Sequence, residues 1–144
     1  MSLALVETLS EFTNPQDEVQ LQALDEAIQA INPEFCCDVE FNALLDIFER
    51  FPEIDGYGVF WGIVHALEAC NGYESSLLAS ISRKPCEFNV LMINRLLNTG
   101  VAVIDGQSLI EVLQKVPSNP AATATAGVDA HRYLQKHSDV GAPN

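Results

Sequence analysis

The stretch from Pro85 to Gly100, PCEFNVLMINRLLNTG, constrains the fold of this chain more than any other segment. Pro85 suits the first turn of a helix, because its fixed φ and missing N–H cost nothing there, and Gly100 suits the left-handed residue that ends a helix. Apolar residues between them cover more than one stripe of the helix, and they are Phe88, Val90, Leu91, Met92, Ile93, Leu96 and Leu97. The pattern therefore predicts a central helix with neighbours on several sides.

Two polar residues of this central segment, Asn94 and Arg95, admit two interpretations. An unpaired buried amide or guanidinium costs roughly 1 to 3 kcal/mol, so both side chains need partners if they are enclosed. They either brace the core through a hydrogen-bond network or contact a ligand.

The rest of the chain also shows helical spacing of its apolar residues, with Asn-Pro or Gly punctuation between the periodic segments. Asn14-Pro15 and Asn32-Pro33 are expected to open helices with the proline at the first helical position, and Asp55 to cap another. Residues 101–104 are expected to form an extended apolar linker, after which Asp105 caps the next helix. The predicted helices cover 3–12, 15–31, 34–51, 56–70, 73–83, 85–100, 107–116 and 120–136.

These helices predict an all-α fold without a sheet of three or more strands. Residues 1–144 are expected to form a single domain, with residues 138–144 as a disordered tail. Short connections favour antiparallel helix hairpins, stacked as a short HEAT-like α-solenoid, with an irregular helical bundle as the alternative. The predicted core contains Phe41, Leu45, Phe48, Phe60, Val64, Leu67, Leu91, Ile93 and Leu97. Because the central helix is expected to be enclosed, Leu91→Ala should cost about 2 to 5 kcal/mol.

The charge of the chain is large and unevenly spread. The full sequence has a formal charge of −13. Residues 1–55 contain 13 acidic residues and Arg50 as their one base, a net of −12, whereas residues 56–144 carry a net of −1. This balance disfavours binding to nucleic acid or to an anionic membrane surface. It favours a basic protein partner.

The acidic residues form a stripe along the predicted third helix. Asp38, Asn42, Asp46, Glu49 and Glu53 recur at intervals of four and three. Like charges at this spacing destabilise a helix by about 0.2 to 0.5 kcal/mol per pair, so replacing Asp38, Asp46 and Glu49 by Lys should leave the fold intact or slightly more stable. The stripe is either a solvated face or, together with the acids of the second helix, a surface for a basic partner.

Aromatic residues extend this candidate surface. Tyr57, Trp61, His65 and Glu68 are spaced along one edge of the predicted fourth helix, and Gly58 and Gly62 leave room there for another backbone. Trp and Tyr often anchor interfaces, although packing within the same chain is the alternative for Trp61. The candidate partner-binding residues are Asp25, Glu26, Asp38, Asp46, Glu49, Glu53, Asp55, Tyr57 and Trp61.

The sequence favours a protein without enzymatic activity. It contains no phosphate-binding glycine loop, nucleophile elbow or metalloprotease helix, and its exposed carboxylates lack the unequal environments of an acid–base pair. Cys36, Cys37, Cys70 and Cys86 lack the spacing of a zinc site and are expected to be free thiols. No catalytic residue, metal or cofactor is therefore expected. A cytoplasmic location is expected, because no membrane-length apolar run and no signal peptide is evident.

The segments FPEIDGYGVFWGIVHALE and RKPCEFNVLMINRLLNTG, within residues 51–116, resemble small helical immunity proteins of bacterial polymorphic-toxin and contact-dependent growth inhibition systems. The resemblance lies in the acidic composition, the helix-pair layout and the segments FPE…DGYG…W and RLLNTG. It implies a cytoplasmic protein that binds a basic toxin domain, often a nuclease, and blocks its active site. A helical-repeat adaptor for protein–protein interaction is the alternative.

Overall fold

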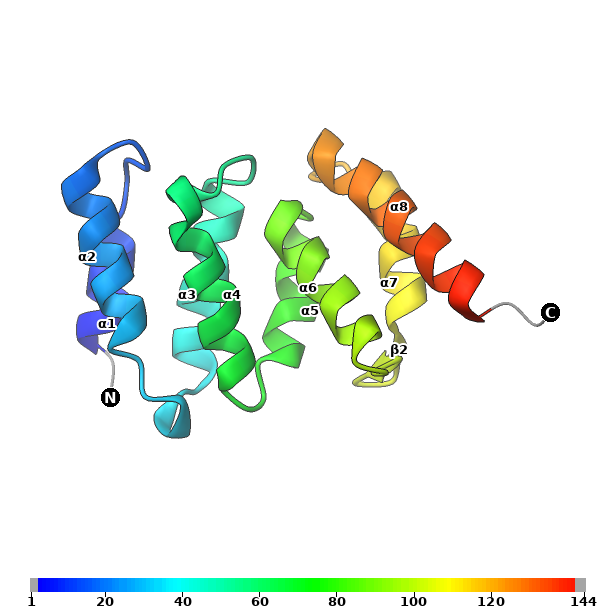
Figure 1. The fold of residues 1–144 in the computed structure, drawn as a ribbon, viewed down its shortest axis with the longest axis horizontal. Helices are drawn as coiled ribbons and strands as arrows, with labels where there is room; N and C mark the ends of the chain where they lie inside the picture. Colours follow the sequence, from blue (N-terminus) through cyan, green and yellow to red (C-terminus); the bar gives the residue numbers. More distant parts are fainter. Residues whose placement is uncertain (1–2, 142–144) are drawn as a thin grey trace.

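The computed structural model describes residues 3–141, and these form an all-α fold whose helices pair as antiparallel hairpins (Figure 1). The α-helices are α1 (Leu3–Glu11), α2 (Glu18–Gln29), α3 (Asp38–Arg50), α4 (Val59–Ala69), α5 (Glu74–Arg83), α6 (Glu87–Asn98), α7 (Leu109–Lys115) and α8 (Ala124–Gly141). The short 3₁₀ turns are η1 (Pro33–Phe35), η2 (Gly56–Gly58) and η3 (Val116–Ser118). The strands β1 (Val103–Ile104) and β2 (Gln107–Ser108) form one small antiparallel sheet.

The hairpins stack side by side along the chain in two layers, as in a short solenoid (Figure 1). In one layer α1 packs against α3, and α3 packs against α5. In the other layer α2 packs against α4, and α6 packs against α8. Consecutive helices therefore alternate between the layers, and α2 and α3 lie in different ones. The predicted fold class is confirmed, including the absence of a sheet of three or more strands from residues 3–141.

Phenylalanine rings join the first three hairpins at the centre of the stack. Phe48 of α3 stacks on Phe88 of α6 with ring centroids 5.1 Å apart, and Phe60 of α4 meets both of these rings. Phe12, which follows α1, packs edge-on against Phe60. Each ring removes a large apolar surface from water, so this cluster fixes how the hairpins meet.

Most of the predicted core is buried, with two exceptions on α6. The correctly predicted core residues are Phe41, Leu45, Phe48, Phe60, Val64, Leu67 and Ile93. Leu91 and Leu97 are only partly buried and lie at the edge of the core. Helix α6 does have neighbours on several sides, as predicted, because it packs against α3, α5, α7 and α8. Leu91 and Leu97 were nevertheless wrongly predicted to be core residues, since that part of α6 is only partly covered.

The prolines lie farther from the helices than predicted. Pro15 precedes α2 by a turn, and the carboxylate of Asp17 caps that helix by accepting a hydrogen bond from Val19 N. Pro33 opens only η1, and Pro85 lies before the N-cap of α6. In α3 and α6 the third residue of the helix accepts a hydrogen bond from the backbone N–H of the cap, a capping-box interaction with cysteine at the cap position.

The linker after α6 differs from its prediction. Asp105 and Gly106 both have positive φ, 51° and 75°, and join β1 to β2 as a two-residue hairpin turn. Asp105 therefore does not cap α7, and Ser108 takes that role by accepting from Glu111 N.

Helix α8 also differs from its prediction, because it continues to Gly141. Residues 138–141 are thus helical where disorder was predicted, and residues 142–144 lie outside the described residues. The buried side chain of Tyr133 and a hydrogen-bonding contact of 2.8 Å between His137 Nε2 and Asn94 Oδ1 hold this end of α8 on α6.

Candidate functional site

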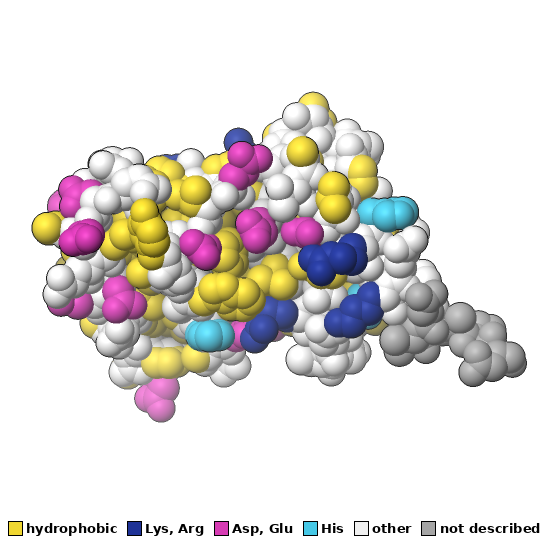
Figure 2. Space-filling model, turned by 45° about the horizontal axis from the view of Figure 1, so that its top comes forward, with side chains coloured by type: hydrophobic (Ala, Val, Ile, Leu, Met, Phe, Trp, Pro, Cys, Tyr) yellow, Lys and Arg dark blue, Asp and Glu magenta, His cyan; other side chains and the backbone are white. Residues whose placement is uncertain are grey.

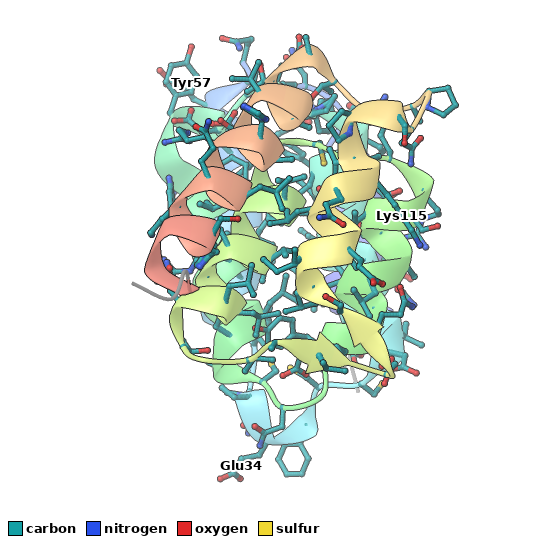
Figure 3. The ribbon with its side chains drawn as sticks, turned by 90° about the vertical axis from the view of Figure 1, so that its right-hand side faces the viewer. Glu34, Tyr57 and Lys115 are labelled. Carbon is teal, nitrogen blue, oxygen red and sulfur yellow. The ribbon has the colours of Figure 1, made fainter. Side chains whose placement is uncertain are left out.

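The predicted partner-binding residues do not form one continuous face. Asp25 and Glu26 belong to α2 in one layer, whereas Asp38, Asp46 and Glu49 belong to α3 in the other. Asp38 begins α3 at the end of the molecule where Glu34 lies, and Tyr57 lies at the opposite end (Figure 3). The idea of a single acidic face on the second and third helices is therefore wrong.

Two of the four carboxylates in the acidic stripe, those of Asp46 and Glu49, are neutralised within the protein. Asp46 Oδ2 lies 2.8 Å from Arg50 Nε, and the guanidinium of Arg50 also donates to the backbone oxygens of Leu9 and Phe12. Glu49, with 13% of its side chain exposed, pairs with Arg83 of α5 at 2.8 Å and accepts a hydrogen bond from Ser80. Lysine at these two positions would break these contacts. This removes the basis for expecting the triple lysine substitution to spare the fold.

The acids of α2 make only weak interactions. Asp25 accepts a hydrogen bond from Gln29 at 2.9 Å, and Glu26 accepts one from Gln22 at 3.2 Å, both on the exposed side of the helix. Asp38 is also exposed. In the described part of the chain, none of these three carboxylates lies within ion-pair distance of a basic group.

The loop after α3 brings Glu53, Asp55 and Tyr57 together, and its backbone presents the tyrosine outward. Gly56, Tyr57 and Gly58 all have positive φ, and the φ of 55° at Tyr57 is a conformation that L residues other than Gly, Asn and Asp rarely adopt. A Cβ at Gly56 would lie 2.8 Å from the Phe60 ring, so the loop is packed tightly onto the start of α4. Tyr57 remains 74% exposed.

Side-chain contacts hold this loop in place. Asp55 accepts a hydrogen bond from Tyr57 N and is the cap of η2, not of α4, whose N-cap is Gly58. The Tyr57 hydroxyl lies 2.6 Å from Gln16 Oε1, to which it donates. Gly58 has a φ of 90°, a left-handed conformation that glycine adopts readily. A Cβ at Gly58 would meet nothing within 4 Å, so the predicted close approach of another backbone at this position is wrong.

Trp61 occupies the seam between α4 and α6. Its ring meets Phe88 edge-on at 5.6 Å and lies 5.9 Å from the guanidinium of Arg95, while 38% of the residue stays exposed. The guanidinium itself makes a two-bond ion pair with Glu68 of α4 at 2.7 and 2.8 Å. Arg95 and Asn94 thus both make contacts between helices, which is the bracing role that the sequence left open.

Glu87, the first residue of α6, completes this region and was not among the predicted residues. It lines a hollow of about 410 Å³ together with Pro15, Gln16, Glu53, Ile54, Asp55, Gly56 and Tyr57. The pKa of Glu87 is raised, first by partial burial of its carboxylate and then by the charges of Asp129 and Asp55. Sequence spacing gave no signal for Glu87, because its proximity to Asp55 depends on how α6 packs beside η2.

We call this region the Tyr57–Trp61 surface, comprising Glu53, Asp55, Tyr57, Trp61, Glu87 and Leu91. Leu91 belongs to it by helical spacing, because it lies about one turn from both Phe88 and Arg95, the two residues of α6 that the Trp61 ring contacts. In the described residues no basic group lies within 4.0 Å of its carboxylates. Figure 2 shows one face of the molecule, on which hydrophobic and acidic side chains lie side by side, while most of the visible Lys and Arg side chains lie in the half nearer the C-terminal end. Four of its six members, all except Glu87 and Leu91, were predicted from the sequence as parts of an acidic and aromatic surface.

Cys36 and Cys86 have shifted pKa values, and both shifts disfavour a reactive thiolate. Burial raises the pKa of Cys86 to about 12. The pKa of Cys36 is also raised to about 12, first by burial and then by its hydrogen bond with Cys70. The four cysteines are free thiols, and no cluster of His, Cys, Asp and Glu suited to a metal ion occurs within the described part of the chain.

Comparison of the chain with protein-family models, curated proteins and solved structures gives no significant match. None of the helices within residues 3–141 is both long and apolar enough to span a membrane. Function is therefore inferred from the chain's own residues.

Proposed function

We propose that this protein is a non-enzymatic immunity or inhibitor protein, which binds one basic protein and blocks its activity by covering its functional surface. The observation that carries this proposal is the charge imbalance, a net of −12 over residues 1–55. Arg50 and Arg83 neutralise only Asp46 and Glu49, so most of these acids make no ion pair in the described structure. A protein with so large an excess of carboxylates over basic groups favours a partner of opposite charge.

The arrangement of the acids suits fast capture of such a partner. Charges spread over the hairpins α1/α2 and α3/α4 attract a basic protein over roughly a Debye length, about 8 to 10 Å at physiological salt. Exposed aromatic side chains then provide the short-range contact that slows dissociation. The mechanism is steric occlusion of the partner, guided by electrostatic attraction.

The resemblance of residues 51–116 to bacterial immunity proteins suggests the kind of partner. Those proteins bind toxin domains, often cationic nucleases, in the cytoplasm. A basic nuclease domain uses its positive charge to hold nucleic acid, so an acidic protein that covers the same surface would compete directly with the substrate. This supports a toxin domain as the partner and the cytoplasm as the compartment.

Co-purification tests the proposal. The tagged protein would be recovered from its native host at low ionic strength, and bound proteins identified by mass spectrometry. We expect one basic protein in equimolar amount, released by salt, and toxic or nucleolytic when separated from this protein. Recovery without a stoichiometric basic protein would contradict the proposal. Several weakly bound proteins would instead favour an adaptor, to which stacked helix hairpins are also suited.

A further inference from the structure

The stripe of α3 and the Tyr57–Trp61 surface could each receive a basic partner, and the contacts of the structure distinguish them. On α3, Asp46 and Glu49 already pair with Arg50 and Arg83. A partner that used those carboxylates would have to replace existing ion pairs, so little binding energy would be gained. At the Tyr57–Trp61 surface the carboxylates of Glu53, Asp55 and Glu87 form no ion pair with any basic group of residues 3–141.

The aromatic members of this surface are held ready for contact. Tyr57 stands 74% exposed on a backbone of positive φ, and its hydroxyl is fixed by Gln16. Trp61 is 38% exposed and rests against Phe88. Side chains fixed in this way lose little conformational freedom on binding, which is the property of interface anchors.

The charges around the rings determine the kind of occupant. Arg95 lies over Trp61 but is neutralised by Glu68, so it does not repel a cation. The hollow of about 410 Å³ beside Tyr57 has an apolar part, from Pro15 and Ile54, and a rim of carboxylates. An apolar floor with an acidic rim complements a Lys or Arg side chain, whose stem is apolar and whose end is cationic.

We infer that the Tyr57–Trp61 surface receives a Lys- or Arg-bearing segment of a protein partner. A cationic side chain of this segment lies on the Tyr57 ring, between Glu53, Asp55 and Glu87. Trp61 and Leu91 cover the apolar residues of the segment beside that side chain. The inference rests on the proposed function, since that supplies the basic partner. It adds that the partner docks on the layer of α4 and α6, and not on the stripe of α3.

A fluorescence titration tests the docking surface, because Trp61 is the chain's one tryptophan and reports directly on it. The probe is a hexa-arginine peptide, with a neutral hexapeptide of Ser and Gly as its control. We expect hexa-arginine to change the Trp61 emission in a saturable and salt-sensitive way, and the neutral peptide to leave it unchanged. An unchanged emission with hexa-arginine would overturn the inference.

Two variants of equal charge separate local contact from general attraction. Glu53→Gln/Glu87→Gln removes two carboxylates from the Tyr57–Trp61 surface, and Glu34→Gln/Asp38→Asn removes two at the opposite end of the molecule (Figure 3). We expect the first pair to weaken hexa-arginine binding about fivefold, as two exposed ion pairs would, and the second pair to have less than about a twofold effect. Equal weakening by both pairs would overturn the inference.

Tyr57→Asn provides a further check, because Asn tolerates the left-handed φ but lacks the ring. Weaker hexa-arginine binding with unchanged thermal unfolding is expected, and unchanged binding would overturn the role of the ring. The co-purified partner separates this inference from the proposed function. If a basic protein binds equally to wild type and to Glu53→Gln/Glu87→Gln, the docking surface is wrong and the function stands. If hexa-arginine binds as expected but no basic protein is recovered, the function is wrong.

Discussion

Asn89 shows how a single polar side chain can fix the start of a buried helix. It is fully buried, and its Oδ1 accepts a hydrogen bond from Cys86 N at 2.8 Å. Its Nδ2 donates to Ser80 Oγ and to the backbone oxygen of Lys84. One side chain therefore caps α6 and ties it to α5 and to the turn between them.

Removing this amide should be costly. Asn89→Ala leaves a buried N–H and a buried carbonyl without their partner, and we expect a loss of about 2 to 3 kcal/mol in the free energy of unfolding. Asn98→Ala, at the exposed end of the same helix, should change it by less than about 0.5 kcal/mol. Urea denaturation of both variants checks this expectation, and similar losses would mean that the network around Asn89 contributes little.

The Gly56–Tyr57 pair separates backbone strain from packing. Tyr57→Gly relieves a left-handed φ that costs a non-glycine residue about 1 to 2 kcal/mol, and this offsets the greater freedom of glycine in the unfolded chain. We expect a stability equal to that of wild type or slightly higher. Gly56→Ala should lose about 2 to 3 kcal/mol, because its Cβ would lie 2.8 Å from the Phe60 ring at a positive φ. Thermal unfolding measures both, and a marked loss for Tyr57→Gly would show that the tyrosine ring stabilises the fold.

Glu87 should make stability depend on pH in a predictable direction. Its pKa is raised in the folded protein by burial and by Asp129 and Asp55, so the native state holds its proton more tightly than the unfolded chain does. Asp129 itself pairs with Arg132 at 3.0 Å, whereas no ion pair of Glu87 or Asp55 is seen within residues 3–141. The contribution of Glu87 is present below its unfolded pKa, about 4.3, and is lost as the pH rises through its higher folded value.

The isosteric variant Glu87→Gln tests this direction. It should be more stable than wild type at pH 7, and the difference should disappear near pH 4. Urea midpoints across this pH range measure the effect. A variant less stable than wild type at pH 7 would show that the Glu87 carboxylate makes a favourable interaction in the fold.

Among the elements, α6 shows both what helical spacing predicts correctly and what it does not predict. Ile93 is fully buried, whereas Leu91 is only partly buried. We therefore expect Ile93→Ala to cost about 3 to 4 kcal/mol and Leu91→Ala only about 1 kcal/mol, below the range predicted from the sequence. Chemical denaturation of the two variants gives the comparison. Equal costs would mean that α6 is enclosed on the Leu91 side as well.

Most of the helices were found from the spacing of their apolar residues, because that spacing is set by burial on one side. The Ala-rich α8 lacks such a clear pattern, and its predicted bounds, 120–136, differ from the observed Ala124–Gly141. The caps were harder to predict. Cys37 and Cys86 are unusual at N-cap positions, and only Glu40 and Asn89, at the third helical position, carried a capping signal. The Asp105-Gly106 dipeptide is a recognised hairpin signal that the short apolar flanks concealed. Ion pairs between helices, such as Glu49 with Arg83, depend on which helices are neighbours, and spacing does not contain that information.

At the scale of the whole molecule, the two-layer stack explains why the acidic residues were only partly interpretable from the sequence. Successive helices alternate between layers, so α2 and α3, adjacent in sequence, present their acids on different sides (Figure 1). Tyr57 of η2 and Glu87 of α6, which are far apart in the sequence, instead line the same hollow. The charge imbalance could be read from the composition alone. The place where acidic and aromatic side chains come together could be found only from the fold.

The net charge of −13 should give salt opposite effects on folding and on binding. Repulsion among the carboxylates opposes the compact state, and screening reduces it, so raising NaCl from about 10 to 200 mM should increase the unfolding temperature. A control with an uncharged solute such as glycerol, at the same osmolality as the NaCl, separates the effect of charge screening from that of preferential exclusion of solute. The few ion pairs of the structure oppose this trend, but each is at least partly exposed and so contributes little. Association with a basic partner should slow over the same range, because steering is screened as well. Calorimetry and stopped-flow fluorescence measure the two effects, and a fall in unfolding temperature with salt would show that internal ion pairs outweigh the self-repulsion of the acidic N-terminal hairpins.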